Sequence, residues 1–167
     1  MRSPLPTTSL DDPFGSARPG DVVLALIERA GGATPVVHPG GPVGLVEIDV
    51  DACTGCSTCA TSCPTGALTT REDAHHTALW FDAGACVACG TCTARCPEVE
   101  HGAIDLTRVV DTSRLRGGPG RLWEGEVARC SRCGAPIAAA ALLARFAMRL
   151  DDERLVAALS ERCPDCR

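Results

Sequence analysis

Two patterns of apolar and polar residues open the ordered part of the chain. Apolar residues recur at positions 22, 23, 26 and 27, and Gly31 and Gly32 follow them, so this spacing predicts a helix over residues 22–30 with Asp21 as its N-cap. Residues 33–44 are rich in Gly and Pro and are expected to be irregular. The alternation over residues 45–50 then predicts a strand.

A second helical pattern lies near the C-terminus. An Ala-rich apolar stretch predicts a helix from about residue 136 to residue 150, and a shorter helix is expected around residues 152–160. The apolar stripe of the first helix is expected to pack on its neighbour, with docking onto a larger subunit as the alternative. We expect the arginines of these helices to form a solvated face rather than an anion site; they are Arg145, Arg149, Arg154 and Arg162.

The middle of the chain repeats itself at an interval of 33 residues. The first group of cysteines is Cys53, Cys56, Cys59 and Cys63, and the second is Cys86, Cys89, Cys92 and Cys96. A proline follows the last cysteine of each group (Pro64 and Pro97), and the second copy carries two extra residues around positions 99–101. An internal duplication with pseudo-two-fold symmetry is the simplest explanation.

The spacing within each group is typical of cluster ligands. A Cys-x₂-Cys-x₂-Cys-x₃-Cys-Pro run places three thiolates on a tight loop, and small residues between them let backbone amides face the sulfur atoms of a bound cluster. Two such runs predict two [4Fe–4S] clusters; two zinc sites or a disulfide framework are the alternatives. Ligand spacing of this kind favours a reducing compartment over a secreted, disulfide-bonded protein.

With both motifs complete, residues 45–106 resemble the bacterial two-[4Fe–4S] ferredoxin family. The resemblance implies two short β-hairpins and two short helices around the clusters, and one-electron transfer as the activity. In this family the fourth cysteine of each run begins a helix and reaches the other cluster. The resemblance therefore implies cluster I on Cys53, Cys56, Cys59 and Cys96, and cluster II on Cys86, Cys89, Cys92 and Cys63.

Motifs on both sides of this unit extend the resemblance. The stretches at 38–44, 129–136 and 163–167 follow one another in an order similar to that of the long ferredoxin-type proteins associated with molybdopterin formate dehydrogenases. This resemblance implies a larger redox enzyme as partner, within a hetero-oligomer.

Four further cysteines lie near the C-terminus. Cys130, Cys133, Cys163 and Cys166 form a Cys-x₂-Cys-x₂₉-Cys-x₂-Cys set. Four thiolates without an open position are typical of structural zinc, which we predict here. Because the knuckles also resemble those of rubredoxin, a single iron, a third Fe–S cluster, disulfides or free thiols remain alternatives. The long interval predicts a helical hairpin clipped shut at its base.

Charge and composition exclude several classes of function. The formal charge of −5 would become about −11 with two clusters and one zinc, so we expect no nucleic-acid partner. No apolar run is long enough to cross a bilayer and residues 1–20 carry no export signal, so we expect no membrane insertion and a cytoplasmic location, with export together with a signal-bearing partner as the alternative. We find no catalytic constellation and expect the histidines to be solvated loop residues (His38, His75, His76 and His101). Trp80 and Phe81 are expected to cover a cluster from water.

Together these patterns predict an α+β protein in five segments. They are a disordered or partner-bound tail (1–20), a helix with a Gly/Pro-rich connector (21–44), a dicluster ferredoxin domain (45–106), a linker (107–128) and a helical Cys₄ element (129–167). The function expected is that of an electron-transfer subunit between a catalytic oxidoreductase and another redox partner. A freely diffusing ferredoxin and a redox-sensing regulatory protein are the alternatives.

Overall fold

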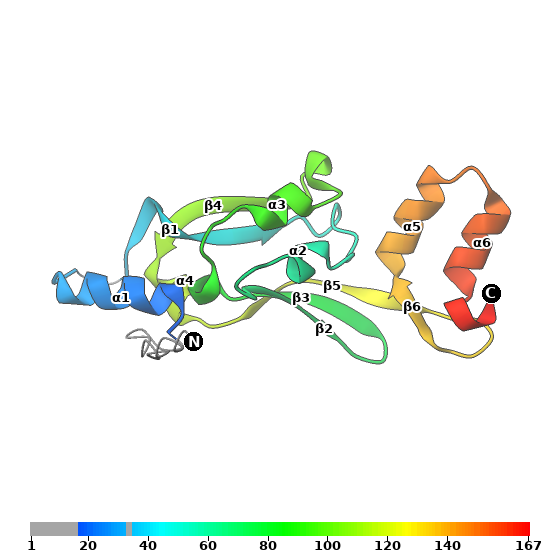
Figure 1. Cartoon of the computed structure of the whole chain (residues 1–167), viewed down its shortest axis with the longest axis horizontal. Helices are drawn as coiled ribbons and strands as arrows, with labels where there is room; N and C mark the ends of the chain where they lie inside the picture. Colours follow the sequence, from blue (N-terminus) through cyan, green and yellow to red (C-terminus); the bar gives the residue numbers. More distant parts are fainter. Residues whose placement is uncertain (1–16, 33–34) are drawn as a thin grey trace, which may run out of the picture.

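The computed structural model describes residues 17–32 and 35–167, so most of the expected tail lies outside the described residues. Figure 1 shows an elongated molecule that contains both helices and sheets. Helix α1 lies at one end and the helices α5 and α6 lie at the other, with the two cysteine runs between them.

Two strands join the ends of the predicted ferredoxin unit. Strand β1 (Val37–Ile48) pairs antiparallel with β4 (Ile104–Asp111), so the first strand does not form a hairpin with its chain neighbour. The expectation of an irregular stretch up to residue 44 is therefore wrong for most of its length. Only between Pro39 and Gly44 does the register break, where Gly40 and Gly41 have φ values of +80° and +126° that glycine adopts readily.

The second sheet has four strands in the order β2-β3-β5-β6. Strands β2 (Leu68–Glu72) and β3 (His76–Phe81) form a hairpin, and the Asp73 carboxylate closes its tip by accepting hydrogen bonds from the amides of His75 (2.7 Å) and His76 (2.8 Å). Strand β5 (Gly120–Arg129) extends the hairpin and pairs on its other side with β6 (Pro136–Ala139).

The linker expected over residues 107–128 is instead regular structure. It contains the end of β4, helix α4 (Thr112–Arg116) and most of β5. Leu115 and Trp123 from this segment are only 1% and 5% exposed, so the segment contributes to the core rather than connecting two bodies. The segment is ordered because its strands pair with β1 and β3, which are distant in sequence.

Short helices carry the third cysteine of each run. Helix α2 (Thr58–Thr61) contains Cys59 and helix α3 (Thr91–Arg95) contains Cys92. The fourth cysteine comes after each helix, so the expectation that it begins a helix is wrong. The two extra residues of the second copy form part of the short turn η2 (Val99–His101), and two further turns, η1 (Ala83–Ala85) and η3 (Pro164–Cys166), complete the fold.

Helix α1 (Pro19–Arg29) begins earlier than expected. Pro19 occupies its first turn, where a missing amide hydrogen costs nothing, and Asp21 is the third helical residue rather than the N-cap. Its carboxylate accepts a hydrogen bond from the backbone amide of Arg18 (3.2 Å). The helix ends before Gly31, as predicted, and the Gly32 amide donates to the Ile27 carbonyl at 2.9 Å.

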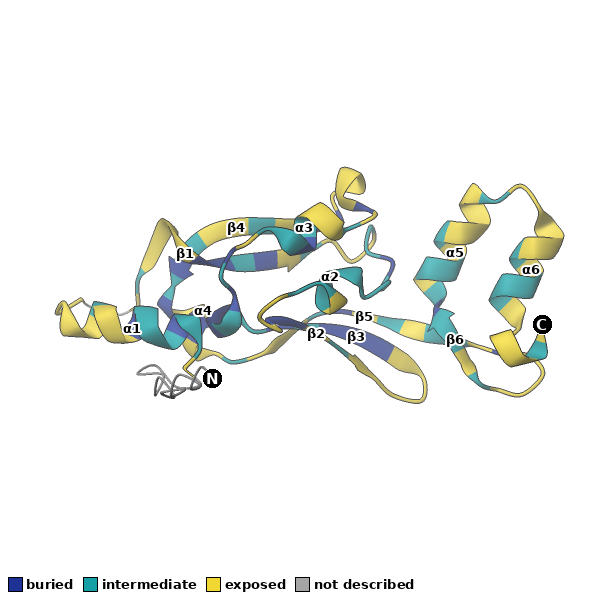
Figure 2. Ribbon diagram, in the orientation of Figure 1, coloured by how far each residue is buried: buried dark blue, intermediate teal, exposed yellow. Residues whose placement is uncertain are grey.

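The first of the two C-terminal helices begins later than predicted. Residues 136–139 form β6 because they pair with β5, so α5 runs over Ala140–Arg149 only. Helix α6 (Glu153–Glu161) lies where a helix is predicted around residues 152–160, and Asp152 is its N-cap. Figure 2 shows that neither helix contains a buried residue. Within the described part of the chain, no helix combines the length and apolar content that a bilayer crossing requires.

Candidate metal centres

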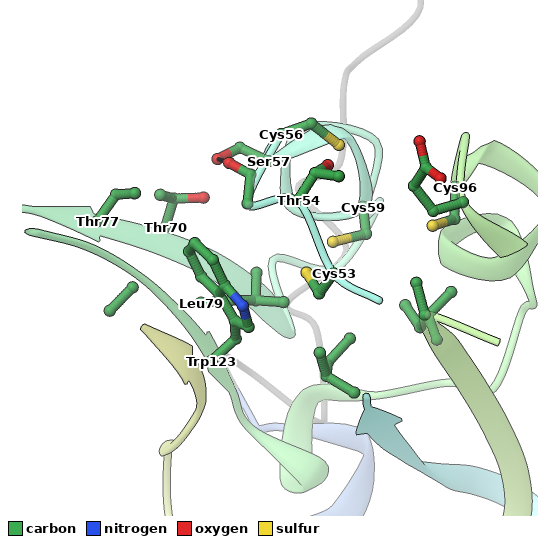
Figure 3. A pocket seen from close by; sticks show the side chains of 16 residues that line it. Cys53, Thr54, Cys56, Ser57, Cys59, Thr70, Thr77, Leu79, Cys96 and Trp123 are labelled. Carbon is green, nitrogen blue, oxygen red and sulfur yellow. Dashed lines mark hydrogen bonds between the residues drawn. The ribbon is translucent and has the colours of Figure 1, made fainter. Parts of the chain in front are cut away.

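The first candidate centre is a cavity between the two cysteine runs (Figure 3). Its cysteines are Cys53, Cys56, Cys59 and Cys96. The first two come from the loop after β1, the third from α2, and the fourth from the residue that follows α3. The space between the side chains measures about 470 Å³, part of it open to solvent.

The second candidate centre mirrors the first. Its cysteines are Cys63, Cys86, Cys89 and Cys92, and it measures about 300 Å³. Phe81 lines this cavity. Each cavity therefore collects three thiols of one run and the fourth thiol of the other run.

Burial makes several of the thiols in these cavities resist ionisation. Burial raises the pKa of Cys53, Cys86 and Cys92, and burial together with the neighbouring Cys53 and Cys56 raises the pKa of Cys59 to about 12. Burial and mutual repulsion both disfavour thiolates here, so a bound group with positive iron would supply the missing compensation.

Cys89 and Cys63 lie in more polar surroundings. Hydrogen bonds with the Thr91 hydroxyl and amide lower the pKa of Cys89. Burial opposes ionisation of Cys63, but hydrogen bonds from Leu68, Thr65 and Ala67 outweigh it and lower the pKa of that thiol. These two thiols therefore ionise most readily in the second cavity.

The lining of the first cavity fits an iron–sulfur cluster. Among the described residues the buried Thr70 hydroxyl has no hydrogen-bond partner, and Thr70 lines this cavity, so a bound group could accept a hydrogen bond from it. The amides of Gly55 and Ala60 favour the ionised forms of Cys53 and Cys59. In the second cavity the amide of Ala88 donates to the sulfur of Cys86 at 3.4 Å. Thiols surrounded by such donors are the donor set that holds [4Fe–4S] clusters.

The aromatic cover of the first cavity is Trp123, which sequence reasoning missed. Its ring lines the cavity, and its Nε1–H donates to the Val50 carbonyl at 3.3 Å. Trp80, expected to cover a cluster, lines neither cavity and stacks instead under the Arg71 guanidinium, 4.1 Å from the ring centre. The sequence offers one indication of this role: Trp123 is one of few large aromatic residues in a chain with two Trp and three Phe.

A buried carboxylate borders the first cavity. The side chain of Glu98 is 4% exposed, and it lies 3.2 Å from Arg149 and 3.5 Å from Arg145. The expectation of a solvated arginine face is therefore wrong for these two residues, because the fold brings α5 against the end of the second run. Arg154 and Arg162 are exposed, as expected.

The third candidate centre closes the C-terminal hairpin. The sulfur atoms of Cys130, Cys133, Cys163 and Cys166 all lie within 4.8 Å of one another. The Cys133 and Cys163 sulfur atoms are 3.6 Å apart, and tetrahedral zinc with Zn–S bonds of about 2.3 Å separates its ligands by about 3.8 Å. The Ser131 amide donates to the Glu161 carbonyl at 2.8 Å beside them, so the thiols lie at the base of the α5–α6 hairpin.

In this third centre the Cys130 thiol ionises at a lower pH than Cys163 and Cys166. The amides of Cys163 and Cys133 donate to the Cys130 sulfur and lower its pKa to about 6. Hydrogen bonds with the thiols of Cys133 and Cys163 raise the pKa of Cys166 to about 12. All four histidines are exposed, and among the described residues none belongs to a metal-binding group.

Comparison with known proteins gives a match for the central unit. Residues 52–100 match the family model described as "4Fe-4S dicluster domain", a match that includes both cysteine runs. No curated protein sequence matches the chain.

Proposed function

Because residues 52–100 form a dicluster ferredoxin-type domain, whose role is iron–sulfur electron transfer, we propose that this chain is the electron-transfer subunit of a larger oxidoreductase. It passes single electrons between a catalytic subunit and a second redox partner. Cluster I is held by the thiols of the first cavity, and cluster II by the thiols of the second. Each cluster supplies a one-electron couple when bound.

The main support for this proposal is that the fourth cysteine of each run lines the cavity of the other run. Cys96 leaves α3 to enter the first cavity, and Cys63 leaves α2 to enter the second. The helices α2 and α3 are in contact with each other. The exchange therefore brings the two cavities close together, as electron transfer between clusters requires.

One thiol of the second cavity lies at the surface. Cys89 is exposed, whereas Cys86 and Cys92 of the same cavity are buried and all four thiols of the first cavity are partly buried. We infer that a redox partner docks beside Cys89 and that electrons enter or leave the protein there. Trp123 covers the first cavity and restricts the docking of a redox partner beside cluster I.

A subunit role is supported by the segments outside the central unit. Helix α1 is held to this unit by Arg18, whose guanidinium donates to the Asp82 carboxylate at 3.0 and 3.1 Å. Helix α5 exposes large apolar side chains, with Phe146 46% and Met148 71% exposed. Such a surface favours docking onto another protein. The order of the flanking motifs favours an enzyme of the molybdopterin formate dehydrogenase type.

We also infer that the C-terminal Cys₄ set binds zinc, which would hold the hairpin closed. Its donor set contains sulfur only and lacks an open position, which is typical of structural zinc. Zinc undergoes no redox reaction, so it would stabilise the docking element without joining the electron path. A cytoplasmic location completes the proposal.

Anaerobic purification of the tagged full-length chain from its native host tests the subunit role. We expect a stable complex that contains a larger redox subunit and transfers electrons to the clusters when substrate is supplied. A chain that runs as a lone monomer with both clusters would contradict the subunit role and favour a diffusing ferredoxin. A chain without iron and sulfide would contradict the electron-transfer function itself.

A further inference from the structure

We propose that Glu98, Arg145 and Arg149 set the reduction potential of cluster I and make the two clusters of this duplicated unit unequal. This inference rests on the proposed binding of cluster I in the first cavity. It assigns to α5, which lies outside the ferredoxin unit, a direct role in electron transfer.

Glu98 is placed to act on cluster I. It lies two residues after Cys96, and its side chain lines the first cavity together with Cys96. Because this side chain is 4% exposed, water screens its charge only weakly.

Two cations from a distant segment compensate this carboxylate. Arg149 lies 3.2 Å from Glu98 and Arg145 lies 3.5 Å from it, and the two arginines are one helical turn apart on α5. Among the described residues, these contacts provide all the ion pairs between the α5–α6 hairpin and the rest of the protein. His101 lies 3.8 Å from the same carboxylate and adds positive charge only when protonated.

The internal repeat provides a comparison within the molecule. Thr65 occupies in the first run the position of Glu98 in the second, since it also follows a Cys-Pro pair. Thr65 is exposed and uncharged, and its hydroxyl lies 3.7 Å from the Cys63 sulfur at the second cavity. The carboxylate and its arginines therefore distinguish the cluster I side from the cluster II side.

The sign of the effect follows from charge. Reduction adds one negative charge to a cluster, so nearby positive charge raises its potential and nearby negative charge lowers it. Glu98 with two arginines has a net positive charge. Without the arginines, a buried negative charge would remain beside cluster I.

Redox titration of the anaerobic full-length protein tests this inference. The two clusters can be followed separately through the paramagnetically shifted β-protons of their cysteines. In Arg145→Gln/Arg149→Gln we expect the ratio of reduced to oxidised cluster I at a fixed potential to fall at least tenfold, a shift of about 59 mV for a one-electron couple. Cluster II should change far less. Glu98→Gln should move cluster I in the opposite direction.

Two further variants separate charge from structure. Arg145→Lys/Arg149→Lys keeps both charges and should retain most of the potential, whereas Arg154→Gln removes one charge from an exposed position of the same hairpin and should leave cluster I unchanged. If the double Gln variant does not fold, Arg149→Gln alone should give a smaller shift of the same sign, because this side chain is half exposed.

Iron and sulfide analysis of the same samples separates this inference from the proposed function. Two clusters in the wild-type protein, with a cluster I potential that moves no further in the arginine variants than in Arg154→Gln, would overturn the inference alone. Equal shifts of both clusters would also overturn it. Absence of clusters from the wild-type protein would overturn the proposed function.

Discussion

The ring of Trp123 lies directly against the backbone of Gly55 in the first cysteine loop. A Cβ atom at Gly55 would overlap Cη2 of this ring and would lie 2.6 Å from Cζ3. Gly55 also has a φ of +67°, a conformation that other residues adopt at a cost. The Trp ring and the loop that carries Cys53 and Cys56 thus fit together only because position 55 has no side chain.

We predict that Gly55→Ala lowers the occupancy of cluster I. The new methyl group must displace Trp123 or the cysteine loop, and either movement disturbs the first cavity. Iron analysis should show a decrease from about eight iron atoms per chain toward about four. Gly66→Ala is a matched control, since Gly66 has a φ of +65° but no atom within 4 Å of its Cβ position. Equal iron loss in both variants would assign the effect to backbone strain alone.

We predict that Trp123→Ala exposes cluster I to solvent and oxidants. The ring is 5% exposed, so its removal should destabilise the protein by about 3–5 kcal/mol and admit water to the first cavity. Cluster absorbance should then decay faster in air, and the cluster I potential should rise as its surroundings become wetter. Trp80→Ala, which removes a ring that lines neither cavity, should leave both properties close to those of the wild type. Unchanged decay in Trp123→Ala would show that Trp123 does not protect the cluster.

Short-range patterns allowed much of the central unit to be predicted. The cysteine groups follow from spacings of a few residues, and the mixed α and β content follows from local periodicity. The structure brings together the two crossed sets that the ferredoxin resemblance implies and the C-terminal set that the spacing suggests. These features were accessible because the residues that define them are neighbours in the chain or in its repeat.

Features that depend on distant segments could not be predicted in this way. Residues 37–39 are a strand only because β4 pairs with them, and residues 136–139 are a strand rather than a helix because they pair with β5. The contact between Glu98 and Arg149 joins residues 51 positions apart. No local pattern of hydrophobicity or charge marks such a pair.

We predict that Arg18→Gln loosens α1. The substitution removes the paired hydrogen bonds to Asp82 and the contact with Asp21, and because Arg18 is 35% exposed the loss should be about 1 kcal/mol. Amide hydrogen exchange of α1 should be faster in this variant. Arg18 also lowers the pKa of Asp21, so the contribution of this carboxylate is present above its unfolded pKa of about 3.9 and is lost as the pH falls further.

Arg116→Gln provides the control for α1. Arg116 of α4 contacts Glu28 of α1 at 2.7 Å, but the two side chains are 42% and 61% exposed. Its removal should change the stability by less than about 0.5 kcal/mol. A larger effect from Arg116 than from Arg18 would contradict the anchoring role of Arg18.

The last prediction concerns pH and the C-terminal Cys₄ set. In the metal-free chain the pKa of Cys130 is about 6, so this thiol is a thiolate at neutral pH, whereas the pKa of Cys166 is about 12 and that of Cys163 is also raised. Metal binding must therefore release the protons of Cys163 and Cys166, and metal affinity should rise with pH. As the pH falls through about 6, Cys130 is protonated as well and the remaining affinity should be lost.

Zinc analysis after dialysis against a chelator at pH values from 8 to 5 measures this dependence. We expect about one zinc per chain at pH 8, a steep loss near pH 6, and loss at every pH in Cys133→Ser, which lacks one ligand. The iron content at pH 8 should be the same in the variant and the wild type, because the Cys₄ set is separate from both cluster cavities. Zinc retention that does not depend on pH, or iron in place of zinc, would contradict a structural zinc site held by these four thiolates.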